Sequence, residues 1–399
     1  MTQYFFIVIL VLLSACTRAP LKNKEQAMRR VWTSPFLSDD LPMETLLRGL
    51  KEQAAVLKTK PEGTLLTFGP KTISAVEYAN ALESLAQYAE THLDPGQVYD
   101  EIEARFDFYL PYGSNRWGQV LMTSYYEPEI PGARKRTDKY SEPLLSTPDD
   151  LVEVSLGKLD ERFSDLGQLR GRILKQKTVR ATPQLVPYYA RDEIQRGALK
   201  NRQLELVWTD PIDAFFLQIQ GSGTILLEEG GNLRVGYADQ NGQPYLAIGR
   251  FLKDVIPIEK ITLASLENHL RGLPREGAQD LLNRNPSYVF FQKREGPAVT
   301  SVGSPVVPGR TIATDNRYFP KGALAFLQFD KPKFATPEAL EALEWNASSR
   351  FVFDQDTGGA IRGGGRLDLF WGSGPQAKQS AGVIKQNGNL YYLVPRSKE

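Results

Sequence analysis

The sequence predicts a mainly β protein with peripheral helices, an α+β fold. From residue 285 to the carboxyl end, short runs of strand-forming residues alternate with Gly and Pro, which is typical of a small barrel or sandwich. Two earlier stretches, 43–57 and 76–89, carry apolar residues at helical spacing. The chain has 399 residues, 41% of them hydrophobic, so it is long enough to build two domain-sized cores.

The amino terminus predicts export and lipid anchoring. An apolar run at 4–13 is too short to span a bilayer as a helix, and it fits a signal peptide over residues 1–15. Small residues then lead into Cys16, the only cysteine, in a pattern that resembles the bacterial lipobox. Acylation of Cys16 would anchor the chain, with 16–34 as a polar tether. The alternative is a buried free cysteine.

Helices are expected in the first part of the chain and again in its middle. The stretch 43–57 follows Asp39 and Asp40, which can cap its first turn, and a third helix is expected at 97–109. Further on, 246–255 and 263–270 also have helical spacing. We expect these helices to be structural.

Strands are expected at 120–126 and then throughout the second half of the chain. Residues 141–150 form an expected loop, whereas 215–220 alternate towards their end and predict a strand with Gln218 and Gln220 on one face. Asn387-Gly388 predicts a hairpin turn before the last strand. The remaining expected strands are 225–227, 233–237, 288–291, 310–313, 323–329, 350–353 and 390–394.

Composition excludes several kinds of function. The formal net charge is +1, so no global field attracts nucleic acid. The chain has only two histidines, His92 and His269, and both fall in or at the end of expected helices. With Cys16 acylated, no Cys/His metal cluster and no Ser-His-Asp triad is expected, and we expect no cofactor. Acid/base chemistry by carboxylates remains.

Three aspartates lie in a setting that suits such chemistry. Asp315 follows an expected strand, Asp356 begins Asp-Thr-Gly-Gly, and Asp368 follows a run of glycines. Glycine lets the backbone approach a ligand closely, and the apolar neighbours Leu367 and Leu369 can raise the pKa of Asp368 by desolvation. The alternative is that these are turn aspartates. An aspartic protease is a third interpretation, but it needs two Asp-Thr-Gly carboxylates and this chain has one.

A series of motifs then resembles one known family. They run in order through Ser124-Tyr125-Tyr126-Glu127-Pro128, Phe216-Leu217-Gln218-Ile219-Gln220-Gly221-Ser222-Gly223, Arg234-Val235-Gly236-Tyr237-Ala238, Asn241-Gly242-Gln243-Pro244-Tyr245, Ile248-Gly249-Arg250, Asn285-Pro286-Ser287-Tyr288-Val289-Phe290-Phe291, Pro308-Gly309-Arg310 and the aspartate segments. Over about residues 105–395 the chain is similar to the membrane-bound lytic murein transglycosylase A family. Ser124 departs from the family, whose members often have Gly there.

The resemblance implies a double-psi β-barrel with a smaller β domain inserted in it and a groove between them. Residues 35–127 would hold the helices and the first part of the large domain, 128–280 the insert, and 281–399 the rest of the barrel with the aspartates. The strand at 120–127 would then join the carboxyl-terminal part of the barrel across the insertion.

The resemblance also implies a function. The chain would be a peptidoglycan lytic exotransglycosylase, a carbon–oxygen lyase that needs no metal or cofactor. It would cut the β-1,4 bond between N-acetylmuramic acid and N-acetylglucosamine and leave 1,6-anhydro ends. Asp368 maps onto the catalytic acid, supported by Asp356 and Asp315. The expected substrate-binding residues are Tyr125, Tyr126, Gln218, Gln220, Ser222, Gly223, Thr357, Gly358 and Gly359.

Thr17 after the lipidated cysteine implies sorting to the outer membrane, on its periplasmic face, in a Gram-negative bacterium. Expected partners are peptidoglycan glycan strands and the outer membrane, with cell-wall enzyme complexes as further partners. Two alternatives stay open. One is a peptidoglycan hydrolase that uses Asp368 and Asp356, and the other is a non-catalytic peptidoglycan-binding lipoprotein.

Overall fold

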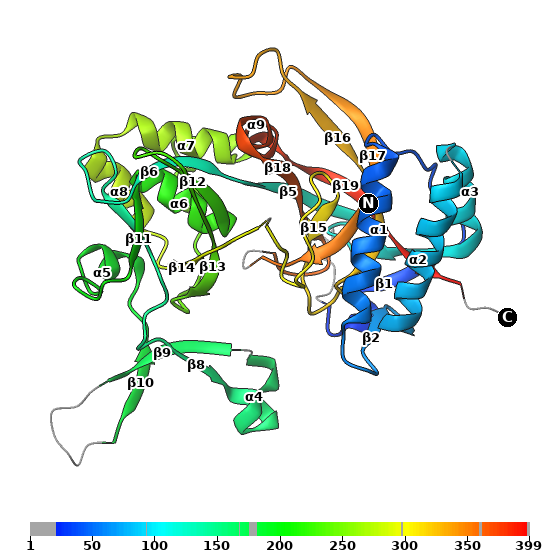
Figure 1. Cartoon of the computed structure of the whole chain (residues 1–399), viewed down its shortest axis with the longest axis horizontal. Helices are drawn as coiled ribbons and strands as arrows, with labels where there is room; N and C mark the ends of the chain where they lie inside the picture. Colours follow the sequence, from blue (N-terminus) through cyan, green and yellow to red (C-terminus); the bar gives the residue numbers. More distant parts are fainter. Residues whose placement is uncertain are drawn as a thin grey trace, which may run out of the picture.

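The computed structural model describes residues 21–92, 94–166, 168–174, 182–296, 298–358 and 361–396. The expected signal peptide and Cys16 lie outside these ranges. Within them no helix is both long enough and apolar enough to cross a bilayer. Figure 1 shows two bodies side by side, one built from the first and last parts of the chain and one from its middle.

The first body is a closed barrel. Strand β5 pairs with β18 on one side and with β19 on the other, which closes a six-stranded ring in the order β19-β16-β17-β15-β18-β5. The ring confirms the expected barrel, and it confirms that β5 joins the carboxyl-terminal strands across an insertion. Its strands are β5 (Gln119–Glu127), β15 (Thr311–Ala313), β16 (Ala323–Lys333), β17 (Glu344–Asp356), β18 (Arg366–Ser373) and β19 (Lys385–Pro395).

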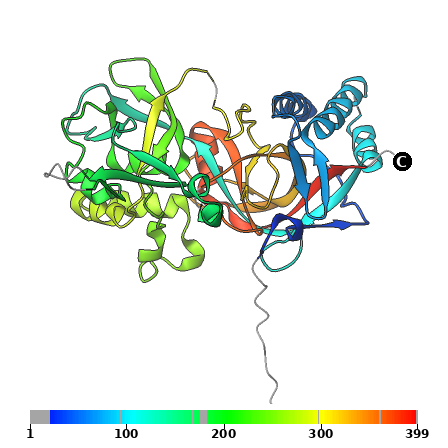
Figure 2. The same ribbon diagram turned by 90° about the horizontal axis from the view of Figure 1, so that it is seen from below.

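Helices cover the side of the barrel away from the second body (Figures 1 and 2). They are α1 (Met43–Lys58), α2 (Ala75–Thr91) and α3 (Pro95–Arg105), with a hairpin of β2 (Leu65–Phe68) and β3 (Lys71–Ser74) between the first two. Ser74 caps α2 by accepting from the Glu77 N–H, and Asp94 caps α3 just before Pro95. The apolar faces of α1 and α2 are buried in the barrel core, as their spacing predicted.

The third helix is shorter than expected. It ends at Arg105, and residues 106–109 lie in β4 (Phe106–Pro111), which pairs with β19 and with β1 (Met28–Val31). The aromatic residues of this segment favour a strand as soon as a partner edge is available. Pairing of β1 with β4 also shows that the expected tether at 16–34 is part of the fold from Met28 onward.

The second body is the insertion. Its main sheet has the order β14-β13-β12-β6-β11-β7, and a separate sheet, β10-β9-β8, projects from it (Figure 1). Its strands are β6 (Glu129–Ala133), β7 (Glu142–Leu145), β8 (Val152–Ser155), β9 (Gln168–Leu174), β10 (Gln184–Pro187), β11 (Glu205–Thr209), β12 (Ser222–Leu227), β13 (Asn232–Gln240) and β14 (Val289–Lys293). Its helices are α4 (Leu156–Leu159), α5 (Arg191–Gln195), α6 (Pro211–Gln220), α7 (Leu263–Gly272) and α8 (Arg275–Asn283).

Four sequence expectations are wrong here. Strand β14 pairs with β13, so the insertion runs past the expected boundary at residue 280. The expected loop at 141–150 contains β7, and 246–255 contains only a short 3-10 helix, Ile248–Phe251. Asn387 and Gly388 are not a turn, because they pair with β5 inside β19. The last strand is instead preceded by α9 (Gly374–Val383), which packs on β5.

Candidate active site

The strand register brings two of the predicted aspartates onto one face of the barrel. Asp368 in β18 stands opposite Ala313 in β15, and Ala313 on its other side stands opposite Asp356 in β17. A bulge makes this possible, since Ile312 pairs with Asp354 and the next residue, Ala313, pairs with Asp356. Cross-strand partners share a face, so the two carboxyl groups flank one small side chain.

Asp368, Ala313 and Asp356 form what we call the aspartate row, and most of the Asp368 side chain is covered there. Its side chain is 20% exposed, its Oδ1 accepts a hydrogen bond from Thr123 Oγ1, and an Arg366 nitrogen lies 3.8 Å from the same oxygen. Burial raises the pKa of Asp368 and the Asp356 charge raises it further, against the lowering effects of Arg366 and Thr123. The balance is a raised pKa, which suits a group that must hold a proton.

Asp356 is held by three donors. Its Oδ1 accepts from the backbone N–H groups of Thr357 and Ser301 at 2.9 and 3.0 Å, and its Oδ2 accepts from Tyr125 Oη at 2.9 Å. Burial raises the pKa of Asp356 despite these donors. Burial and Asp356 also raise the pKa of Tyr125 well above its usual value, so Tyr125 stays protonated and remains a donor. The Tyr125 ring packs against Phe370 with centroids 5.2 Å apart.

Asp315 has a different environment from the other two aspartates. Its carboxylate receives both Nε and Nη2 of Arg317, the latter at 2.6 Å, and the Gly363 N–H at 2.7 Å. Burial would raise its pKa, but these donors hold the pKa of Asp315 below its usual value. Asp315 therefore joins the end of β15 to the glycine segment that precedes β18, and it is not among the groups that act on the pKa of Asp368.

The expectation for Gln218 and Gln220 is wrong in its geometry. Residues 215–220 belong to helix α6, so residues two apart point in nearly opposite directions and not to one strand face. Gln218 is buried and its Oε1 accepts from Arg191 Nη2 at 2.6 Å. Gln220 Oε1 accepts from the Tyr126 N–H at 3.1 Å, which ties the helix to β5.

The other expected sugar contacts are spread over different roles. Tyr126 is only 4% exposed and packs against α9, so the structure gives it no free ring face. Gly221 ends α6 with a φ of 84°, and Ser222 begins β12, so the segment joins a helix to a strand and not two strands. A Cβ on Gly223 would lie 2.8 Å from Pro128 O, which makes this glycine a packing requirement.

The segment after Asp356 stays close to the carboxylate. Thr357 offers its N–H to Asp356, and the Gly358 carbonyl accepts from the Ile361 N–H at 3.0 Å. Gly359 lies outside the described residues. Of the predicted contacts, Tyr125 and Thr357 therefore touch the aspartate row directly.

Sequence reasoning missed three residues at this site, namely Thr123, Arg366 and Tyr245. Thr123 lies two residues before Tyr125, and alternation along β5 places both side chains on the same face, which was a usable signal. Tyr245 comes from the insertion. Burial raises the pKa of Tyr245, and so does the charge of Asp368, whereas Arg366 and Arg191 lower it. The Tyr245 hydroxyl is therefore within electrostatic range of the acid. The acid therefore lies where the barrel meets the insertion.

A second link crosses at the same place. Lys385 in β19 pairs with Thr123, and its Nζ donates to the Ile258 carbonyl of the insertion at 3.0 Å. Among the residues that the structure describes, no group of three or more His, Cys, Asp or Glu could hold a metal ion. The chemistry available in the row is proton transfer by a protonated carboxyl group beside hydrogen-bond donors.

Comparisons with known proteins agree with this architecture. A family model for the MltA specific insert domain matches residues 121–292, and a model for the 3D domain matches residues 310–394. The membrane-bound lytic murein transglycosylase A of Vibrio cholerae is 32% identical over 211 residues, which is 51% of this chain and 55% of the relative. The match thus spans about half the length of that relative.

Two solved structures show the same fold. A membrane-bound lytic murein transglycosylase from Agrobacterium tumefaciens has a TM-score of 0.72 at 24% identity, covering 92% of this chain and 98% of its own. The Escherichia coli MltA structure with bound chitohexaose has a TM-score of 0.67 at 20% identity, covering 94% and 98%. These likenesses confirm a double-psi barrel with a second domain.

Proposed function

Because this chain belongs to the membrane-bound lytic murein transglycosylase A family, we propose that it is a lytic transglycosylase of peptidoglycan. Its reaction would cut the β-1,4 bond between N-acetylmuramic acid and N-acetylglucosamine. The observation that carries the proposal is Asp368, a mostly covered carboxyl with a raised pKa at the junction of barrel and insertion. The Vibrio cholerae relative is named for this activity.

One carboxyl group is enough for the reaction. Protonated Asp368 gives its proton to the glycosidic oxygen as the bond from C1 breaks. The resulting carboxylate then takes the proton of the C6 hydroxyl on the same muramic residue, and O6 bonds to C1 to close a 1,6-anhydro ring. The attacking hydroxyl is already part of the substrate, so proximity replaces an enzyme nucleophile or an ordered water. Asp368 ends the cycle protonated.

The neighbours of Asp368 have separate roles in this mechanism. Asp356 disfavours the ionised form of Asp368 by like-charge repulsion, so the acid is ready to donate. Thr123 donates to the carboxylate and orients it for the second step. Asp315 holds the glycine segment in place. The three donors on Asp356 leave it poorly available as the second carboxylate that hydrolysis requires.

Our proposals for the substrate and the location rest on the same family. The Escherichia coli structure contains chitohexaose, a chain of N-acetylated sugars, and we propose glycan strands of peptidoglycan as the partner of this chain. Lipidation at Cys16 and placement on the periplasmic face of the outer membrane are further proposals. Mass spectrometry of the mature protein tests them, because an unmodified Cys16 would exclude the anchor.

Product analysis with one variant tests the activity. We expect wild-type protein to release muropeptides with anhydro ends from purified sacculi, and Asp368→Asn to fold normally and release none. Asp138→Asn, an exposed aspartate of the insertion, is the matched control and keeps full activity. Products with reducing ends would indicate a hydrolase. Glycan binding without any release of fragments would indicate a non-catalytic protein. An active Asp368→Asn variant would show that another residue is the acid.

A further inference from the structure

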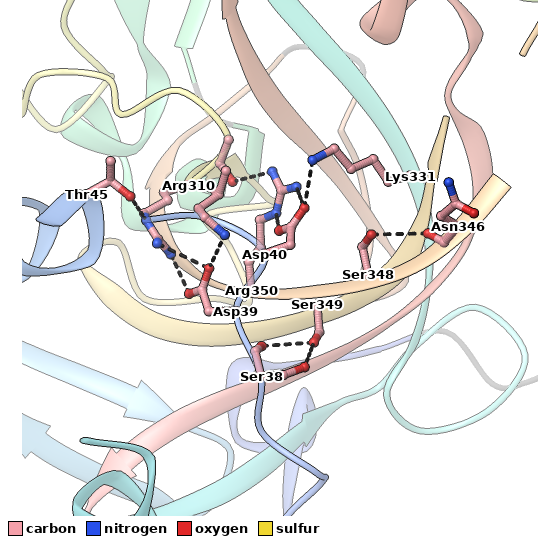
Figure 3. A network of polar contacts seen from close by, with 12 residues as sticks. Ser38, Asp39, Asp40, Thr45, Arg310, Lys331, Asn346, Ser348, Ser349 and Arg350 are labelled. Carbon is pink, nitrogen blue, oxygen red and sulfur yellow. Dashed lines mark hydrogen bonds and ion pairs between the residues drawn. The ribbon is translucent and has the colours of Figure 1, made fainter. Parts of the chain in front are cut away.

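A cavity of about 480 Å³ lies on the barrel wall, apart from the aspartate row. Its floor is formed by β16, β17 and β19, and one wall is the segment that precedes α1, including Ser38 and Asp40. The volume is within the range of small-ligand sites. Figure 3 shows how the wall segment is fixed to β17, with the Ser38 and Ser349 hydroxyls 2.7 Å apart.

The floor presents a row of side-chain amides. Gln328 in β16 stands opposite Ser349 in β17 and opposite Asn389 in β19, so these three residues share a face. Asn387 is two residues from Asn389 along the strand and points the same way. Within the described ranges the amides of Gln328, Asn387 and Asn389 make no hydrogen bond to protein, so they are available to a ligand.

The charges around the cavity disfavour an anionic ligand. Asp39 accepts two hydrogen bonds from buried Arg310, and Asp40 binds Arg350 and Lys331, so these carboxylates are neutralised within the fold (Figure 3). Asp330 lines the floor, is exposed and has no ion pair in the described part of the chain. The charged residues of the lining are all acidic, which disfavours carboxylates and phosphates.

An aromatic ring completes the lining. Phe36 is 85% exposed at the rim, although burying a phenylalanine side chain is favourable. An exposed ring beside free amides and a carboxylate offers a flat apolar surface together with donors and acceptors. That combination matches a sugar ring with hydroxyl groups and an amide substituent.

We propose that this cavity binds a neutral N-acetylated sugar unit, as a second glycan site beside the catalytic one. The choice of sugar over another neutral polar ligand rests on the proposed function. The floor lies on the same barrel face as the acid, since Asn387 is two residues from Lys385, which pairs with Thr123 beside Asp368. A glycan held here keeps the enzyme on the cell wall while Asp368 acts on another segment.

Titration of triacetylchitotriose into full-length Asp368→Asn protein in detergent tests the proposal. We expect two binding events by calorimetry, with nuclear magnetic resonance shifts of the floor amides in one of them. The double variant Gln328→Ala/Asn389→Ala should weaken the affinity of that event about tenfold, as expected for two lost hydrogen bonds. The affinity of the other event should stay unchanged. Gln87→Ala, which removes an exposed amide from α2, leaves both events unchanged.

A second variant guards against misfolding. Ala347→Trp keeps every floor amide but fills the cavity from an exposed position, and it should abolish the same event. The proposal would be overturned if the parent protein shows no binding event that responds to both floor variants, whether it binds once or twice. Equal affinity for cellotriose, a glucose trimer that lacks N-acetyl groups, would overturn the assignment to an N-acetylated sugar. Because binding is measured without cleavage, these results are independent of whether wild type proves to be a transglycosylase.

Discussion

Thr123 offers the sharpest test of Asp368 as the reacting carboxyl. Thr123→Val keeps the shape of the side chain and removes only the hydroxyl that donates to Asp368 Oδ1. A hydrogen bond to a charged group contributes about 1.5–3 kcal/mol. The carboxylate that forms when Asp368 gives its proton to the glycosidic oxygen loses this support, so kcat should fall roughly ten- to a hundredfold. Thr123→Ser keeps the donor and should stay near the wild-type rate.

The same variant has a pH consequence with a definite sign. Thr123 lowers the pKa of Asp368, so its removal raises that pKa. The first step needs the protonated acid, and activity is lost as the pH rises through the pKa of Asp368. The alkaline limit of activity should therefore move to higher pH in Thr123→Val. The assay is the initial rate of muropeptide release from sacculi across pH. A wild-type rate with an unmoved limit would refute the role given to this contact.

Three other substitutions separate structural from functional residues. Asp39→Ala leaves Arg310 buried without its ion pair and should lower the free energy of unfolding in urea by about 3–5 kcal/mol. Adding Arg310→Met should restore part of this stability, and additive losses would contradict the pairing. Asp315→Asn should lower the melting temperature at pH 7. A carboxylate whose pKa is depressed in the fold stabilises it above the unfolded pKa, and this stabilisation is lost as the pH falls. The difference in melting temperature between Asp315→Asn and wild type should therefore narrow below about pH 4. A difference that does not change with pH would argue against the ion pair. Tyr125→Phe removes a hydrogen-bond donor from the aspartate row and should reduce kcat without unfolding the protein. Tyr126→Phe should leave kcat unchanged, because Tyr126 is buried against α9. Equal effects on kcat would contradict the positions given to these two tyrosines.

Local patterns were sufficient where a residue's neighbours in sequence are also its neighbours in space. The helical spacing of 43–57 and 76–89 predicted α1 and α2, and the glycine-flanked motifs singled out Asp356 and Asp368. The run 215–220 was misassigned because a short apolar segment fits a buried helix as well as a strand. Its start at Asp210-Pro211, a cap followed by proline, was the overlooked helix signal.

By itself, the sequence determined the fold class, the order of motifs and the aspartates worth testing, because these depend on periodicity and residue type. Only the tertiary structure decided that a bulge opposite Ala313 places Asp356 and Asp368 on one face while Arg317 binds Asp315. It also decided that Tyr125 reaches the site and Tyr126 does not. The physical reason is that pairing register and burial depend on strands that are distant in the chain, as with Thr123 and Asp368, which are 245 residues apart. No local pattern encodes which partner a strand will meet.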